Sequence, residues 1–172
     1  MTLENIKSKI AKYNSNSQTI TAAYWLLKKF DFKTKNLKGF LFRDDAKPDF
    51  ILMTTEGDFG EPQYIRIPKN TFQFPLELML SLLAHELVHV KQKTEKPYIL
   101  DKNEREFQAY YEMIFHEIFP QTPDISNFHK TFFINKAFEY FNRMGENSVL
   151  QQKYLLQKNK LQTIHDALKT DW

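Results

Sequence analysis

Residues 75–90 read PLELMLSLLAHELVHV, and this stretch carries the strongest structural and chemical signal of the chain. A proline is tolerated in the first turn of a helix, where its missing N–H would have had no partner, so Pro75 can open a helix. The apolar residues that follow cover nearly every face of such a helix, and a helix that is apolar all round is buried in a core. The pattern therefore predicts a buried helix over residues 76–94.

Two histidines and a glutamate interrupt this apolar helix. Residues four apart lie on the same helix face, so the imidazoles of His85 and His89 can bind one zinc ion at about 2.0–2.1 Å. Glu86 is rotated by roughly 100° from His85, which suits it to hold a zinc-bound water and not the metal. This H-E-x-x-H arrangement is typical of metal-dependent hydrolases, in which the glutamate is the general base. The alternative is that both histidines are hydrogen-bonded core residues and the motif arose by chance.

A catalytic zinc site normally takes a third ligand from the protein, and the next predicted helix contains two candidates, Glu104 and Glu106. They lie roughly 200° apart around the helix, so only one can face the metal. Ala109 lies one turn beyond Glu106, and its small side chain would let the two helices pack closely, whereas Phe107 at the same offset from Glu104 is bulky. Glu104, in turn, lies nearer the strongest apolar face of its helix. We favour Glu106 and keep Glu104 as the alternative.

The remaining histidines have weaker patterns. His116 would lie about 15 Å beyond Glu106 along a helix, too far to share its metal. His129 and His165 are isolated on amphipathic helices, where a surface or core role is more common. His129 and Tyr110 would polarise a substrate carbonyl if the fold brought them near the zinc.

The periodicity of apolar residues around the motif predicts an α+β fold. Helices are expected at 3–13 and 18–30, strands at 37–43, 49–54 and 63–67, and further helices at 76–94, 102–119, 124–143 and 147–169. In the third strand Tyr64 and Arg66 alternate with Ile65 and Ile67, as expected of a half-buried strand at the edge of a sheet. At 172 residues, the chain is expected to form a single domain over residues 1–172.

The composition narrows the classes of function. The net charge of +3 is too small to argue for nucleic acid or a membrane as a partner. The absence of cysteine excludes disulfides, thiol catalysis and cysteine-bound zinc. The sequence contains no run of 18 apolar residues, which a membrane span would need, and residues 1–7 lack the apolar region of a signal peptide. We therefore expect a cytoplasmic protein, with export by a signal-independent route left open.

The order of the predicted elements resembles that of the zincin metallopeptidases: a backing helix, three strands ending in an edge strand, the H-E-x-x-H helix and a glutamate-bearing helix. Within this group the chain resembles the gluzincins, whose third ligand is a glutamate in an E-x-x-A-like motif. The matching residues are His85, Glu86, His89, Glu106 and Ala109. The H-x-x-Q spacing of His89 and Gln92 is also similar to that of small bacterial proteins assigned as peptidases. The resemblance covers residues 18–119, the expected zincin-like core, and leaves residues 120–172 as a C-terminal helical extension.

This resemblance implies a small, three-stranded, mostly antiparallel sheet and a zinc-dependent metallopeptidase. Zinc on His85, His89 and Glu106 would activate a water and stabilise the oxyanion, and Glu86 would transfer the proton. A peptide or protein substrate would pair with the strand at 63–67. The first alternative is a catalytically inactive zincin-fold binding or scaffold protein that retains zinc. The second is a helical interaction or nucleic-acid-binding protein without stoichiometric zinc.

Overall fold

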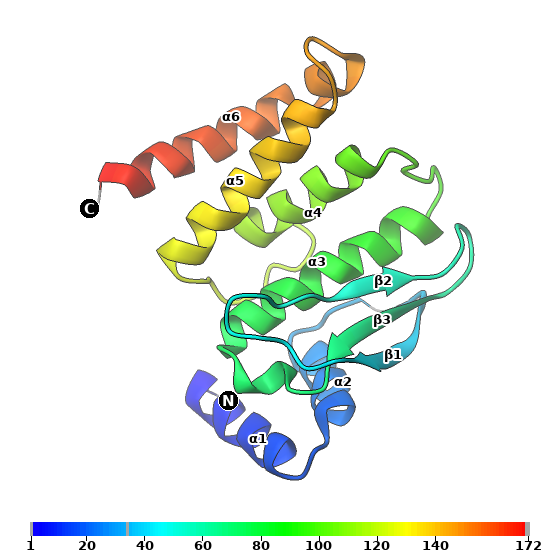
Figure 1. The fold of residues 1–172 in the computed structure, drawn as a ribbon, viewed down its shortest axis with the longest axis vertical. Helices are drawn as coiled ribbons and strands as arrows, with labels where there is room; N and C mark the ends of the chain where they lie inside the picture. Colours follow the sequence, from blue (N-terminus) through cyan, green and yellow to red (C-terminus); the bar gives the residue numbers. More distant parts are fainter. Residues whose placement is uncertain (1, 34, 171–172) are drawn as a thin grey trace.

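The computed structural model describes residues 2–33 and 35–170 and has an α+β fold (Figure 1). The described elements are α1 (Leu3–Ser15), α2 (Thr19–Lys29), β1 (Leu37–Arg43), β2 (Thr54–Glu56), β3 (Gln63–Pro68), the short 3-10 helix η1 (Thr71–Gln73), α3 (Leu76–Thr94), α4 (Lys102–Phe115), α5 (Asn127–Arg143) and α6 (Val149–Thr170). The expectation of an α+β chain with the H-E-x-x-H residues on one long helix is confirmed.

The sheet is mixed, with the strand order β1-β3-β2. β1 pairs in parallel with β3, and the short β2 pairs antiparallel with its other side. Two expectations were therefore wrong: the sheet is not mostly antiparallel, and the strand at 63–67 is central and not at an edge. Ile65 and Ile67 are fully buried, while Tyr64 and Arg66 are half-buried. The alternation in sequence thus reports the two faces of the sheet, and it carries no information about how many neighbours the strand has.

The second strand also differs from the prediction. We expected it at 49–54, but β2 begins only at Thr54, and residues 51–53 are irregular. Met53 is buried, whereas Phe50 and Leu52 are exposed. Ile51, Leu52 and Met53 line a cleft beside α3, so this apolar run is a cleft wall and not part of the sheet.

The predicted helix bounds agree with the structure for α3 and differ at one end of α4 and of α5. α3 has the predicted bounds of 76–94. α4 ends at Phe115, short of the expected 119, because His116 adopts a left-handed conformation with φ of 50°. The Glu112 carboxylate then accepts hydrogen bonds from the backbone N–H groups of Ile118 and Phe119. α5 starts at Asn127, later than the expected 124, because the Ser126 hydroxyl caps it by accepting from the N–H of His129.

Two apolar clusters meet at α4. The larger joins α1, α2, the sheet and α3, and it includes Ala109 and Met113 from one side of α4. The smaller joins the other side of α4, with Phe107 and Tyr111, to α5 and α6. In Figure 1, α5 and α6 lie on the far side of α4 from the sheet. The expected extension from residue 120 onward therefore packs against the glutamate-bearing helix, one layer away from the histidines.

Candidate metal centre

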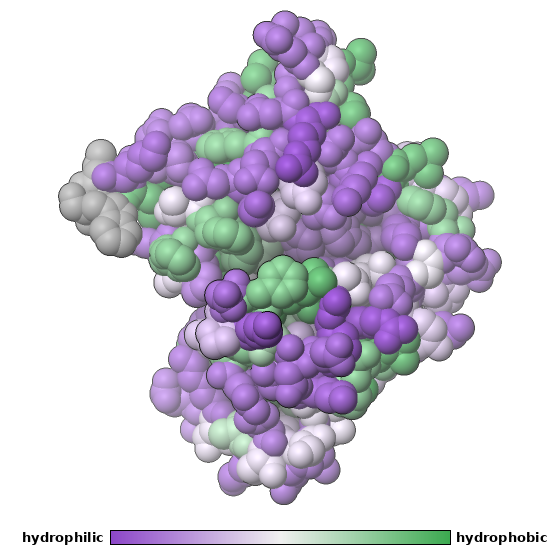
Figure 2. All heavy atoms as spheres, viewed as in Figure 1, coloured by the Kyte–Doolittle hydropathy of each residue, from purple (hydrophilic) through white to green (hydrophobic). Residues whose placement is uncertain are grey.

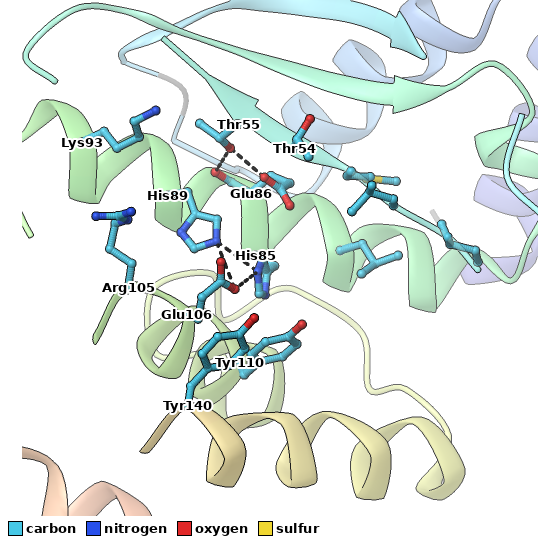
Figure 3. A pocket seen from close by; sticks show the side chains of 14 residues that line it. Thr54, Thr55, His85, Glu86, His89, Lys93, Arg105, Glu106, Tyr110 and Tyr140 are labelled. Atoms are coloured by element: carbon cyan, nitrogen blue, oxygen red, sulfur yellow. Dashed lines mark hydrogen bonds and ion pairs between the residues drawn. The ribbon is translucent and has the colours of Figure 1, made fainter. Parts of the chain in front are cut away.

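Three potential ligand atoms from two helices converge at one point. His85 and His89 lie one turn apart on α3, and Glu106 reaches them from α4 (Figure 3). The two histidine Nε2 atoms are 3.1 Å apart. Glu106 Oε2 lies 3.5 Å from Nε2 of His85 and 3.7 Å from Nε2 of His89.

These separations fit a metal ion. Ligand atoms at about 2.0–2.1 Å from a tetrahedral zinc would be about 3.3 Å from one another. The three observed separations lie on both sides of that value, and the donor set of two imidazole nitrogens and one carboxylate oxygen is one that zinc accepts. In the described part of the chain, this trio is the group of histidine and acidic side chains able to hold a metal ion.

Gln92 fixes the tautomer of His89. The side-chain Nε2 of Gln92 donates to the backbone carbonyl of Arg105 at 3.0 Å, and a carbonyl can only accept. Its Oε1 must therefore face Nδ1 of His89, at 2.8 Å, and that nitrogen must carry the proton. In the neutral imidazole Nε2 of His89 then keeps the lone pair that a metal would need, and in the protonated form it can donate to Glu106, whose Oε2 lies 3.7 Å away. Outer hydrogen bonds of this kind orient metal-binding histidines.

Glu86 is held beside the trio without joining it. Its side chain is 6% exposed, and Thr55 on β2 donates to its Oε2 at 2.8 Å and to its backbone carbonyl at 2.9 Å. The carboxylate therefore lies between the sheet and the histidines, as Figure 3 shows. This is the placement that the rotation of Glu86 around the helix predicts.

Glu104, the alternative third ligand, points the other way. Its Oε1 accepts hydrogen bonds from the Tyr154 hydroxyl at 2.6 Å and from Lys153 Nζ at 2.7 Å, both on α6. The structure thus places Glu106 with the histidines and Glu104 with the C-terminal helix. Ala109 is fully buried among the residues of the larger cluster, in agreement with the close packing expected there.

The charges at the trio favour a cation. Burial alone would raise the pKa of Glu106, but its hydrogen bonds with His85 and His89 outweigh burial and hold the pKa well below its ordinary value. Burial alone would lower the pKa of His89, but the hydrogen bond with Glu106 and the charges of Glu86 and Glu106 raise it overall. An ionised carboxylate thus faces two imidazoles, and a second carboxylate lies nearby.

Two tyrosines complete the wall opposite the sheet. The Tyr110 ring meets that of His85 edge-on with centroids 4.6 Å apart, and Tyr140 of α5 stacks on Tyr110. Burial, with the charge of Glu106 second, raises the pKa of both phenols, so both stay protonated and can donate hydrogen bonds.

The two remaining histidines of this part of the chain lie away from the trio. His129 contacts Ser126 and Phe128, and His116 lies near Asp124. Of the two groups expected to polarise a carbonyl, the fold brings Tyr110 to the site and leaves His129 away from it.

The site lies in an open cleft of about 330 Å³, large enough for part of a peptide. Its walls are the segment from Ile51 to Thr55, one face of α3, and residues of α4 and α5. Figure 2 shows the molecular surface hollowed between the helical part and the sheet, with hydrophobic side chains at the rim.

Sequence reasoning missed several residues of this site. Thr55 and Tyr140 carry no local signal, because β2 and α5 reach the cleft only through tertiary packing. Lys93 could have been predicted, since it follows His89 by four residues and so lies near its helix face, whereas Gln92 was named only for its H-x-x-Q spacing with His89.

Comparisons with family models, with curated proteins and with solved structures give no significant match to this chain. Among the described helices, none is both long and apolar enough to cross a membrane. Because the comparisons give no match, the geometry of the site is the basis for a proposed function of this protein.

Proposed function

We propose that the protein is a zinc-dependent hydrolase, and most specifically a metallopeptidase with a gluzincin-like site. The observation that carries this proposal is the convergence of His85, His89 and Glu106 in an open cleft, with Glu86 held beside them. Buried histidines alone would not need an ionised carboxylate between them, a fixed tautomer and access to solvent. The zincin-like description of the fold belongs to this proposal and is supported by the order of elements along the chain, in which the strands precede the H-E-x-x-H helix and the glutamate helix follows it.

Each group of the site has a separate role in the proposed hydrolysis. Zinc held by the trio would supply the Lewis acidity that makes water nucleophilic near neutral pH. Glu86 accepts the proton of the attacking water and returns it to the leaving amine, and Thr55 orients its carboxylate. The hydroxyls of Tyr110 and Tyr140 donate to the substrate carbonyl oxygen as negative charge develops on it.

An extended peptide would lie along β2 and not along β3. The strand at 63–67 is paired on both sides, so its backbone groups are occupied. Thr54–Glu56 pairs only with β3, which leaves its outer edge next to the cleft. Addition of a strand to a sheet edge is a common way to bind a peptide.

The test combines metal analysis with a search for a substrate. Purified protein should bind one zinc per chain, and His85→Ala and His89→Ala should each lose it. A fluorogenic peptide library should yield a substrate, and Glu86→Gln should slow its hydrolysis by about 10²–10⁴-fold while the zinc content and melting temperature stay near those of the wild type. Glu95→Gln, at the residue that caps the end of the same helix and outside the cleft, is the matched control. Equal cleavage by Glu86→Gln would refute the role of Glu86, and full zinc with no cleavage across a broad library would favour the inactive-scaffold alternative.

A further inference from the structure

Two cationic side chains lie near each other at one end of the cleft. Lys93 comes from α3, one turn after His89, and Arg105 comes from α4, directly before Glu106. Figure 3 shows both on the same side of the histidine pair. Within residues 2–33 and 35–170, no carboxylate oxygen lies within 4.0 Å of either cation.

The surroundings hold these two cations in place. Both lie over the ring of Phe59, Lys93 Nζ at 5.7 Å and the Arg105 guanidinium at 5.4 Å from its centroid. The loop that carries Phe59 is tied to α3, because the N–H of Gly60 donates to the carbonyl of Lys93 at 2.8 Å. Gly60 has φ of +87°, and a Cβ there would come within 2.7 Å of the Tyr98 hydroxyl, so the loop needs glycine at this point.

Arg105 is anchored by neutral groups only. Its Nη1 donates to the carbonyls of Ile99 and Leu100, at 2.9 and 2.7 Å. In the described part of the chain, Nε and Nη2 make no hydrogen bond to protein, and these edges of the guanidinium can bind a carboxylate in a bidentate manner.

Among the described residues, no acid pairs directly with either cation at this end of the cleft, and Asp58 and Glu56 offset the charge of Lys93 only from a distance. Glu56 is engaged by Arg66 at 2.7 Å, and Asp58 acts on Lys93 only at longer range. Burial, followed by repulsion from Arg105, lowers the pKa of Lys93. Two neighbouring like charges without a counter-ion cost free energy, which an anion bound between them would recover.

The two ends of the cleft therefore differ in chemical character along the axis of α3. Leu82, His85, His89 and Lys93 line it in succession at helical spacing. Leu82, with Ile51 and Met53, makes one end apolar, and Lys93 with Arg105 makes the other end cationic. Lys93 follows His89 by about 6 Å along the helix, a span that about two residues of an extended peptide cover.

We propose that Lys93 and Arg105 form an anion subsite that binds a carboxylate of the substrate within about two residues of the bond that is cleaved. The inference rests on the proposed peptidase function for the position of the scissile bond. The carboxylate belongs either to an acidic side chain or to the C-terminus of the peptide, since both present the same group to Arg105.

The experiment uses zinc-loaded full-length protein and fluorescein-labelled heptapeptides in matched pairs. One set carries glutamate or glutamine at each position in turn, and the other has a free or an amidated C-terminus. Cleavage is measured with the wild type, and binding by fluorescence anisotropy is measured with Glu86→Gln, so that the second readout does not depend on turnover. Lys93→Gln removes the charge at the subsite. Lys91→Gln is the control, because Lys91 lies outside the cleft and pairs with Glu95.

We expect the acidic member of a pair to be preferred by about tenfold or more at low salt, with the preference reduced by salt. Lys93→Gln should reduce it to within about twofold, as should Lys93→Glu, while Lys91→Gln should retain it. The set of pairs that shows the preference identifies the source of the carboxylate.

The outcomes separate the subsite from the peptidase function. Cleavage with no acidic preference, or with a preference that Lys93→Gln leaves intact, overturns the subsite and leaves the peptidase proposal standing. A Lys93-dependent binding preference without any cleavage supports the subsite and refutes the peptidase proposal. Neither binding nor cleavage of any peptide overturns both.

Discussion

Replacement of Gln92 tests whether the hydrogen bond behind His89 controls metal affinity. The Gln92 carboxamide makes hydrogen bonds to His89 Nδ1 at 2.8 Å, to the Arg105 carbonyl at 3.0 Å and to Gln108 Oε1 at 2.9 Å. Gln92→Leu has a similar volume and removes all of them. Gln92→Glu keeps an acceptor for His89 but places a carboxylate against two acceptors.

The magnitudes follow from these contacts. Loss of an outer partner of a metal-binding histidine typically weakens metal affinity by about 10–100-fold, so Gln92→Leu should lose about 1.4–2.8 kcal/mol of zinc-binding free energy. Gln92→Glu should bind zinc at least as tightly as the wild type, because a carboxylate is a stronger acceptor for the Nδ1 proton. It should nevertheless lower the stability of the metal-free protein, since each buried group left without a partner costs about 1–3 kcal/mol.

Competition with a chromophoric chelator measures zinc affinity, and thermal unfolding of the metal-free protein measures stability. Gln108→Leu is the control, because it removes one partner of Gln92 and leaves the bond to His89. The reasoning is refuted if Gln92→Leu binds zinc as tightly as the wild type. It is equally refuted if Gln92→Leu and Gln92→Glu lose the same affinity, since the effect would then reflect general disruption of the helix interface.

Three further predictions concern the acids of α4, the helix end after it and the C-terminal helix. Glu106→Ala should remove most zinc binding, whereas Glu104→Ala should leave it near the wild-type value and lower the melting temperature, as metal analysis and calorimetry can show; the reverse result would make Glu104 the ligand. Burial lowers the pKa of His116, so its contribution to stability is present above about pH 6.5 and is lost as the pH falls from there through the lower pKa of the folded state. Melting temperatures should therefore converge or cross between wild type and His116→Asn as the pH falls from 8 to 5.5, because asparagine also accepts the left-handed conformation; a constant difference would contradict this. Tyr154→Phe should destabilise the protein by about 1–3 kcal/mol, measured by denaturant unfolding, and an unchanged midpoint would show that its buried hydroxyl is not needed.

The helix that carries the motif was the most predictable part of the fold. Pro75 and an apolar sequence on all faces define α3, and its predicted bounds match the structure. Glu106 was favoured because of Ala109, and Ala109 is indeed buried where α4 packs against the larger cluster. Such predictions succeed because helix periodicity and close packing depend on residues that are near one another in the sequence.

The sheet was less predictable, because strand neighbours are chosen by tertiary packing. The alternation of β3 is the same whether one or two strands pair with it, so the sequence could not distinguish a central strand from an edge strand. The apolar residues 51–53 resemble a strand, but their side chains face a cleft that only the packing of α3 creates. The same limit hid Thr55 and Tyr140, which come to the site from elements distant in sequence.

The helices after residue 120 extend beyond the resemblance to a known family, yet they connect to the candidate metal centre through a continuous set of hydrogen bonds. His89 bonds to Gln92, Gln92 to Gln108, Gln108 to Tyr154, and Tyr154 to Glu104. The two glutamates of α4 therefore have complementary positions: Glu106 faces the histidines, while Glu104 binds α6. The Arg105 carbonyl already orients the Gln92 carboxamide, and Gln108 supplies a second acceptor for the same amide, so α6 supports this hydrogen-bond network from the opposite side of α4.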